Sequence, residues 1–212
     1  MSTKEKILTT AIQLFNQTGL NNITLRDIAK AVGISTGNLA YHYKNKDIIV
    51  EAAFHQMVAE RDAIMSGVQQ VPSLDKIYNQ NKLFIRLGKK YLFLYVDTVH
   101  ILRYYDNIAA SHRAFMQQSR AYVKGTLAYS VGSGYMRPEK VEGEYDRLAH
   151  ALWMIMTFWL NQLEIRDKTC TLEEEEQLIF TIWDMIYPKL TKKGIDNYRK
   201  VFAEEQRIIR SK

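Results

Sequence analysis

The sequence predicts an all-α protein. Apolar residues recur at helical spacing along nearly the whole 212-residue chain, without sustained strand-type alternation flanked by hairpin turns. Only three prolines interrupt the pattern, and 47% of the residues are hydrophobic. A chain of this length can bury a substantial core in one or two domains. We expect an N-terminal domain over residues 1–62 and a second helical domain over residues 63–212.

The first helix is expected to begin after Ser2, because Ser2 and Glu5 have the spacing of a capping box. Gly19 is placed to end the helix, with Leu20 folding back on Phe15. Its buried stripe comprises Ile7, Leu8, Ala11, Ile12 and Phe15. This helix should support the two short helices that follow.

Two short helices joined by a glycine turn are expected over residues 24–43. Thr24 is a suitable N-cap, with Asp27 as a capping-box carboxylate, so the first should begin at Leu25. Gly33 supplies the turn, because a residue without Cβ accepts positive φ, and Ser35 caps the second helix. The inward residues are Leu25, Ile28, Ala29, Val32, Leu39 and Tyr43.

The outward side of the second short helix is polar and aromatic. It carries Thr36, Gly37, Asn38, Ala40, Tyr41 and His42. Hydrogen-bonding groups around a glycine that permits close backbone approach suit the major groove of DNA. The same geometry also occurs as mere packing between helices.

The segments TLRDIAKAV and GISTGNLAYHYKNKDII resemble the DNA-binding signature of the TetR/AcrR family of bacterial transcriptional regulators, over about residues 4–57. The resemblance implies a helix-turn-helix DNA-binding domain followed by a helical effector-binding and dimerisation domain. It places DNA contacts at Thr24, Arg26, Ser35, Thr36, Gly37, Asn38, Ala40, Tyr41, His42, Lys44 and Lys46. Ala40 stands where the family often has tyrosine; its methyl group can touch thymine but cannot donate a hydrogen bond.

The N-terminal quarter of the chain is basic. Residues 1–50 contain six Lys or Arg against three Asp or Glu, half of the formal net charge of +6. Phosphate binding requires such an excess. Residues 189–212 are also basic; a solvated helix face explains them better than a second nucleic-acid contact.

Further helices are expected along the rest of the chain. A fourth should run from Asn45 toward Ser66, followed by Gly67 and a break at residues 71–73, with Ser73 as the next cap. The remaining helices are expected at about 74–87, 88–105, 107–130, 139–166, 172–187 and 189–209.

The expected helix 139–166 is apolar on more than one face, so it must be covered on two sides. Either a second copy of the chain or the chain itself can supply the second cover. In the family the last long helices form a homodimer, which implies an interface through Leu152, Ile155, Trp159, Leu178, Ile182, Trp183 and Ile186.

The family resemblance also implies a pocket for a small-molecule effector, whose identity the sequence does not specify. Aromatic residues able to line it are Tyr91, Tyr95, Tyr104, Tyr105, Phe115, Tyr129 and Trp159. Aromatic residues at helical spacing also fill ordinary cores. Ligand binding would act by population shift, favouring a body conformation that spoils the spacing of the DNA-binding helices.

Several other classes are disfavoured. We expect no cofactor or metal and no catalytic residue, because the chain lacks a phosphate loop, a spaced carboxylate pair and a Cys/His constellation, and Cys170 is its only cysteine. The longest clearly apolar run, Ala151–Leu160, is half the roughly 20 residues that span a bilayer. The N-terminus does not resemble a secretion signal, so a cytoplasmic location is expected.

The sequence thus favours a ligand-responsive repressor that binds a palindromic double-stranded DNA operator as a homodimer, with no membrane partner. The alternative is a helical small-molecule-binding or interaction module with degenerate DNA binding, for which Ala40 is the only indication.

Overall fold

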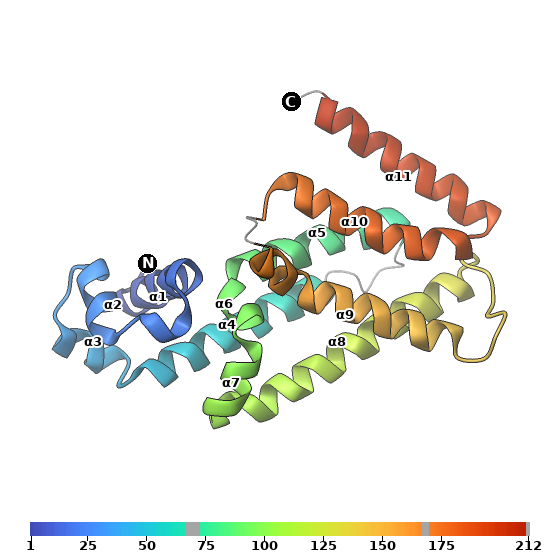
Figure 1. Ribbon diagram of the computed structural model, residues 1–212. Coiled ribbons are helices and arrows are strands. Elements are labelled where there is room, and N and C mark those ends of the chain that lie inside the picture. The colour runs from blue at the N-terminus through green and yellow to red at the C-terminus, as the bar shows by residue number, and fades with distance from the viewer. Residues whose placement is uncertain (67–72, 167–169, 211–212) are drawn as a thin grey trace. The chain divides into compact units, whose positions relative to one another are not determined.

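The computed structural model describes residues 1–66, 73–166 and 170–210, without the side chains of 204–210, and these residues form an all-α fold (Figure 1). The all-α prediction is confirmed. The described residues contain eleven α-helices and two short 3₁₀ helices. No helix within these ranges is long and apolar enough to cross a membrane. The expected Gly67 and the break residues Val71 and Pro72 lie outside the described ranges.

The chain divides into two compact units. Residues 1–62 and 87–115 form the first unit, and residues 63–86 and 116–212 form the second. The expected division at residue 62 assigns segment 87–115 to the second domain, whereas its packing contacts group it with the N-terminal helices.

The first unit contains the N-terminal helices and a short bent segment. Its elements are α1 (Thr3–Thr18), η1 (Leu20–Asn22), α2 (Leu25–Val32), α3 (Thr36–His42), most of α4 (Lys46–Ser66), α6 (Leu92–Val96), α7 (Thr98–Tyr104) and the start of α8 (Asp106–Gly132). Ile7, Phe15 and Ile28 are buried in its core together with Leu39 and Phe54. The capping box of α1 is present, since Ser2 Oγ accepts from the Glu5 amide at 3.2 Å.

The second unit is built from longer helices. It contains most of α5 (Leu74–Lys90) and α8, together with α9 (Glu144–Ile165), α10 (Leu172–Ile186), η2 (Tyr187–Lys189) and α11 (Lys192–Arg210). Helix α11 packs on α10 and α5 through Phe202, whose ring centroid lies 5.7 Å from that of Trp183 and 5.2 Å from that of Tyr78. The Tyr122 hydroxyl of α8 donates to Gln80 of α5 at 2.6 Å.

The helix expected at residues 139–166 begins later than predicted, at Glu144, because a loop precedes α9. The Glu139 carboxylate accepts from the amides of Gly143, the N-cap residue, and of Tyr145 in the first turn, so Glu139 lies in the loop before the helix. Glu144 also pairs with Arg137 at 2.6 Å and Lys189 at 3.2 Å. These hydrogen bonds and ion pairs hold the pKa of the Glu144 carboxyl well below its usual range.

The expected single helix 88–105 is wrong. The segment instead contains the end of α5, then α6 and α7, with a break at Tyr91 (φ −116°, ψ 37°). The break is stabilised by Asn16 of α1, which bonds to both of its sides. The other expected helices exist with ends that differ by a few residues.

Candidate nucleic-acid interface

Local hydrogen bonds define the beginning and end of α2. The Thr24 amide donates to Asp27 Oδ2 at 2.9 Å, and the Asp27 amide donates to Thr24 Oγ1 at 3.3 Å. The hydrogen bonds from the Thr24 side chain and backbone lower the pKa of the Asp27 carboxyl. At the other end, Gly33 lies in the left-handed region (φ 80°, ψ 34°), and its amide donates to Ala29 O at 3.0 Å. The predicted capping box and glycine turn are confirmed.

Helix α3 is attached to the first unit by its inner face. Leu39 and Tyr43 are buried, and Ser35 Oγ caps the helix by accepting from the Asn38 amide at 3.1 Å. The Tyr43 hydroxyl reaches Lys4 O at 3.5 Å, and the Lys4 ammonium lies 5.6 Å from the centre of the Tyr43 ring. The helix therefore has a fixed orientation on α1 and α2.

The outer face of α3 is open to solvent. All of its predicted base-facing residues are exposed: Thr36, Gly37, Asn38 and Ala40. Tyr41 is 86% exposed. The centroid of its ring lies 5.2 Å from that of the His42 ring, in an edge-to-face arrangement. An exposed aromatic side chain next to a row of small polar groups leaves a surface that a DNA groove can cover.

The other predicted DNA contacts surround this face, and three of them, Thr24, Ser35 and Lys46, also have structural roles. Arg26 and Lys44 are exposed. Thr24 uses its hydroxyl in the α2 cap. The Lys46 ammonium donates to Leu20 O at 3.1 Å and Ile23 O at 3.2 Å, so two of its three donors hold the chain before α2.

The structure divides the seven predicted pocket aromatics between the two units. Tyr91, Tyr95, Tyr104, Tyr105 and Phe115 belong to the first unit, and Tyr129 and Trp159 to the second. Tyr104 is 68% exposed, whereas Tyr91 is buried and donates its hydroxyl to Glu60 at 2.7 Å. Burial and the neighbouring Glu60 carboxylate raise the pKa of Tyr91.

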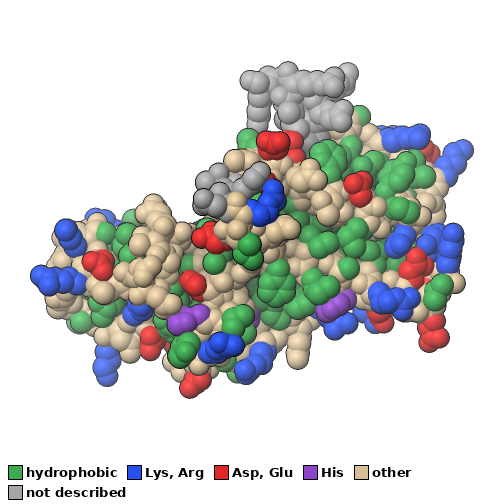
Figure 2. All heavy atoms as spheres, in the orientation of Figure 1, with side chains coloured by type: hydrophobic (Ala, Val, Ile, Leu, Met, Phe, Trp, Pro, Cys, Tyr) green, Lys and Arg blue, Asp and Glu red, His purple; other side chains and the backbone are tan. Residues whose placement is uncertain are grey.

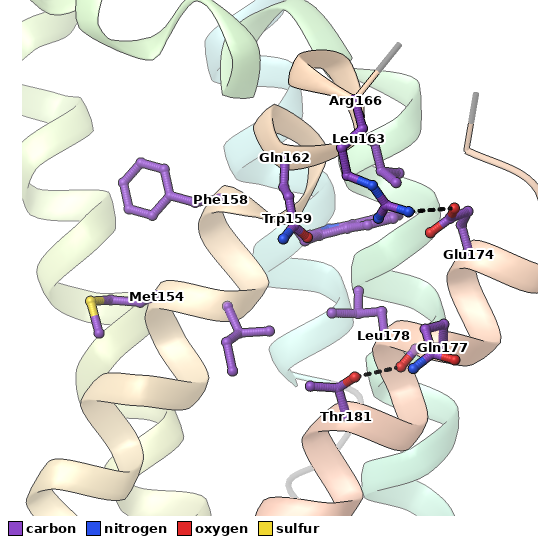
Figure 3. A pocket seen from close by; sticks show the side chains of 11 residues that line it. Met154, Phe158, Trp159, Gln162, Leu163, Arg166, Glu174, Gln177, Leu178 and Thr181 are labelled. Carbon is purple, nitrogen blue, oxygen red and sulfur yellow. Dashed lines mark hydrogen bonds and ion pairs between the residues drawn. The ribbon is translucent and has the colours of Figure 1, made fainter. Parts of the chain in front are cut away.

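Trp159 lines a groove of about 450 Å³ between α9 and α10 (Figure 3). The groove is lined by Met154, Ile155, Phe158, Trp159, Gln162, Leu163, Arg166, Glu174, Gln177, Leu178 and Thr181. At one end the Arg166 guanidinium lies 3.7 Å from the Glu174 carboxylate. The groove is therefore apolar mainly on its α9 side, with the polar Gln177 and Thr181 on α10 and a charged pair at one end.

The predicted interface residues lie mostly inside the chain. Six of the seven are buried, namely Leu152, Trp159, Leu178, Ile182, Trp183 and Ile186, and Ile155 is half-buried. Sequence reasoning did not select the exposed apolar residues beside them. Met154 is 41% exposed, Phe158 46% and Phe180 39%. Figure 2 shows hydrophobic side chains gathered over α9 and α10.

Helix α8 carries a buried histidine that the sequence did not single out. His112 is 2% exposed, and its ring stacks on Phe54 of α4 with centroids 5.7 Å apart. Its Nδ1 has no hydrogen-bond partner, and burial lowers the pKa of the imidazole. In the part of the chain that the structure describes, no three His, Cys, Asp or Glu side chains lie close enough together to hold a metal ion.

Two protein-family models match the chain. The model described as bacterial regulatory proteins, tetR family, matches residues 7–53, and the TetR model described as bacterial transcriptional repressor matches residues 53–198. The helix-turn-helix thus falls within the first match, and the second match covers the rest of the chain as far as the first residues of α11.

Two curated relatives are transcriptional regulators. The negative regulator IcaR of the biofilm operon icaADBC of Staphylococcus epidermidis is 35% identical over 99 residues, which cover 44% of this chain and 52% of IcaR. The uncharacterized regulator YvaF of Bacillus subtilis is 29% identical over 124 residues, which cover 58% of this chain and 65% of YvaF. The chain therefore spans about half the length of IcaR and somewhat more of YvaF.

Solved structures share the fold over nearly the whole chain. A TetR-family regulator from Marinobacter aquaeolei VT8 has a TM-score of 0.85 with 24% identity and covers 98% of both chains. A gamma-butyrolactone receptor described as ArpA-like has a TM-score of 0.69 with 16% identity and covers 95% of both chains. At these identities the likeness concerns the fold alone.

Proposed function

Because the chain belongs to the TetR family of bacterial transcriptional regulators, we propose that it represses transcription by binding a palindromic operator as a homodimer. The observation that carries this proposal is the open outer face of α3, on a helix capped by Ser35 and fixed by the buried Leu39. A rigid helix with such a face fits the major groove, where each base pair presents a distinct pattern of donors and acceptors.

The side chains of α3 divide into two proposed roles. Thr36 and Asn38 offer hydrogen bonds to base edges, Gly37 permits close approach, and the Ala40 methyl suits a thymine methyl. The exposed Tyr41, at the end of the same face, and His42 beside it are proposed to contact the DNA backbone.

Charged and capping residues around α3 are proposed to bind phosphate. Arg26 and Lys44 are exposed cations, and Thr24 lies at the N-terminus of α2, where the helix dipole favours an anion. Lys46 retains one donor for a phosphate after its two bonds to backbone carbonyls.

We propose that the two copies meet through the exposed side of α9 and α10. Met154, Phe158 and Phe180 leave apolar surface there, next to the groove between the two helices. In an isologous dimer the same patch serves both copies, so α9 and α10 of each chain would form a four-helix interface. The two recognition helices would then read half-sites one helical turn, or a multiple of it, apart.

A small-molecule effector is proposed to release the DNA, in keeping with the family. The protein would then work in the cytoplasm, where bacterial operators are, and would have no catalytic role. The competing function is a helical small-molecule-binding or interaction module with degenerate DNA binding. The exposed alanine at position 40 favours it, since that side chain cannot donate a hydrogen bond.

Selection of duplexes from a random DNA pool by the full-length protein tests the proposal. We expect a palindromic sequence to be enriched and bound with strong salt dependence. Asn38→Ala should change the base preference at one position in each half-site, at a cost of about 1–3 kcal/mol against the preferred base. Arg26→Ala should weaken binding to all duplexes equally. It should also reduce the slope of log K against log salt concentration by about one.

The matched control is Lys200→Ala, which removes an exposed cation from α11 and should leave binding unchanged. Failure to enrich any sequence would overturn the proposal and favour the interaction module.

A further inference from the structure

Lys46 is the first residue of α4, a position where the helix dipole disfavours a cation. Asn45 caps this end of the helix, because its Oδ1 accepts from the Ile48 amide at 3.0 Å. The start of α4 is well anchored, since Ile49 and Val50 are fully buried. Lys46 therefore stands on a fixed helix that offers its ammonium no favourable interaction.

The Lys46 ammonium is directed instead to the chain that precedes α2. It donates to Leu20 O at 3.1 Å and to Ile23 O at 3.2 Å, across 26 and 23 residues of sequence. Both partners are buried, with Leu20 0% and Ile23 6% exposed. Ile23 is extended (φ −105°, ψ 130°), so its carbonyl lies outside the helical hydrogen bonds of α2. Backbone carbonyls in such places need a donor, and Lys46 supplies one to each.

These two bonds join the ends of the helix-turn-helix. Helices α2 and α3 lie within residues 25–42, and the chain enters this segment after Ile23 and leaves it before Lys46. The bond from Lys46 to Ile23 O therefore closes the stretch of chain that contains both helices. One of the three ammonium donors remains for a phosphate.

Helix α3 is short and rests on few buried side chains. Its seven residues bury Leu39, and Tyr43 is buried at its C-cap. Recognition of base edges requires side chains to be held within about 0.5 Å of the productive geometry. Two buried side chains leave the tilt of a short helix dependent on the chain at its ends, and Lys46 is the residue that joins those ends.

We propose that Lys46 is a positioning residue whose two bonds to the chain before α2, the Lys46 clamp, fix the orientation in which α3 meets the bases. Lys46 thereby contributes to discrimination between bases without contacting one. A residue that only binds phosphate contributes equally to every sequence. The effect on DNA rests on the proposed function.

DNA binding by the full-length protein tests the clamp with two matched changes of charge. Lys46→Met and Lys44→Met each remove one cation, and Lys44 is exposed. The duplexes are one selected by the wild-type protein and others with one changed base pair. We expect Lys46→Met to reduce the preference for the selected duplex about fivefold or more. Lys44→Met should weaken binding to all of these duplexes by the same factor. Uniform weakening by both variants would overturn the proposal and leave Lys46 with a phosphate contact alone.

Amide hydrogen exchange measures the clamp without DNA. The Ile28 amide donates to Thr24 O at 3.2 Å in the first turn of α2, directly after the clamped chain. In Lys46→Met this amide should exchange about tenfold faster, because the first turn opens more readily once the chain before it is released. The Ile195 amide of the second unit, and the Ile28 amide in Lys44→Met, should keep their wild-type rates. An unchanged rate at Ile28 in Lys46→Met, or an equal increase at Ile195, would overturn the clamp.

A measurement on the wild-type protein covers the case in which Lys46→Met does not fold. Nuclear magnetic resonance detects scalar couplings across a hydrogen bond, between the donor nitrogen and the carbonyl carbon of the acceptor. We expect such couplings from Lys46 Nζ to the carbonyl carbons of Leu20 and Ile23. A Lys46 ammonium that exchanges its protons with water as fast as that of the exposed Lys44 would overturn the clamp.

The two measurements without DNA separate the clamp from the proposed function. If the wild-type protein selects no duplex, the proposed function fails, while the exchange rates and the couplings still decide whether the clamp exists. If a duplex is selected and the couplings are missing, only the role of Lys46 is overturned.

Discussion

Two interruptions in the helices of the first unit are closed in different ways. The turn between α2 and α3 is closed by its own backbone, since the amides of Gly33 and Ile34 both donate to Ala29 O at 3.0 Å. The break between α5 and α6 is closed by Asn16, 74 residues before Lys90 and 77 before Phe93. A turn closed by local bonds depends on its own residues, whereas a break closed by side chains of other helices depends on how those helices pack against it.

This difference bears on the task proposed for the recognition helix. The recognition helix must keep one geometry to read base edges, and the α2–α3 turn supplies it. The break at Tyr91 is instead held by side chains of α1 and α4, so its shape depends on how the unit is packed. Substitutions at the α5–α6 break and at the α2–α3 turn should therefore have different effects on stability.

The largest expected effect comes from the packing that holds the break. Phe93 is 2% exposed and lies against Phe15, so Phe93→Ala should lower the free energy of unfolding by about 3–5 kcal/mol. Urea denaturation of the full chain measures it. Tyr104→Ala, at a 68% exposed aromatic residue of α7, is the control and should cost well under that amount. Similar losses in the two variants would mean that the break does not depend on packing against α1.

The same distinction explains what the sequence could predict. The α2–α3 turn was predicted from Thr24, Gly33 and Ser35 because each acts within three or four residues of its own position. The break at Tyr91 was missed because its cause, Asn16, is an ordinary polar residue on another helix. Side-chain spacing within 88–105 indicates a helix and contains nothing about α1.

The body shows the same limit at the candidate interface. The apolar pattern of α9 predicts a helix that is covered on two sides, and in the single chain Met154 and Phe158 remain exposed. The pattern does not tell which apolar residues face the chain's own core: Leu152 and Trp159 are buried, whereas Met154 and Phe158 are exposed. Orientation of a helix that is apolar all round depends on its neighbours, which its own sequence does not specify.

The second prediction concerns the turn that is closed locally. Gly33→Ala should lower the free energy of unfolding by about 1–2 kcal/mol, because φ is +80° there while nothing lies within 4 Å of an added Cβ. Gly125→Ala in the middle of α8 is the matched control. It also meets no atom within 4 Å and should raise stability by about 0.5–1 kcal/mol. Equal effects of the same sign would show that the left-handed conformation is not what Gly33 supplies.

A third prediction concerns α4, whose Glu60 bonds to Lys90 and Tyr91 at the break. His112 stacks on Phe54 of this helix, and burial lowers the pKa of its imidazole. The unfolded chain therefore binds the proton more readily, so this contribution to stability is complete above the ordinary histidine pKa and is lost as pH falls through and below it. Denaturation at about pH 7.5 and 5.5 should show a loss in the wild type that is smaller in His112→Phe. Equal losses would contradict this contribution.

The smallest expected effect comes from the titration of the Glu60 carboxyl, which bonds to Lys90 and Tyr91 at the break. Burial raises the pKa of the Glu60 carboxyl, but hydrogen bonds from Lys90 and Tyr91 outweigh it, and the net pKa is lowered. A carboxyl with a lowered pKa stabilises the fold above its unfolded value, and the stabilisation disappears as pH falls through the folded value. Glu60→Gln should therefore be less stable than the wild type near neutral pH, with the difference vanishing at about pH 3. Glu142→Gln, at an exposed carboxylate before α9, is the control and should be as stable as the wild type near neutral pH. Parallel pH profiles for the wild type and Glu60→Gln would mean that Lys90 and Tyr91 hold the break without the charge on α4. The uncharged hydrogen bonds at position 60 would then still add to those of Asn16, whereas the turn at Gly33 needs no bond from another helix.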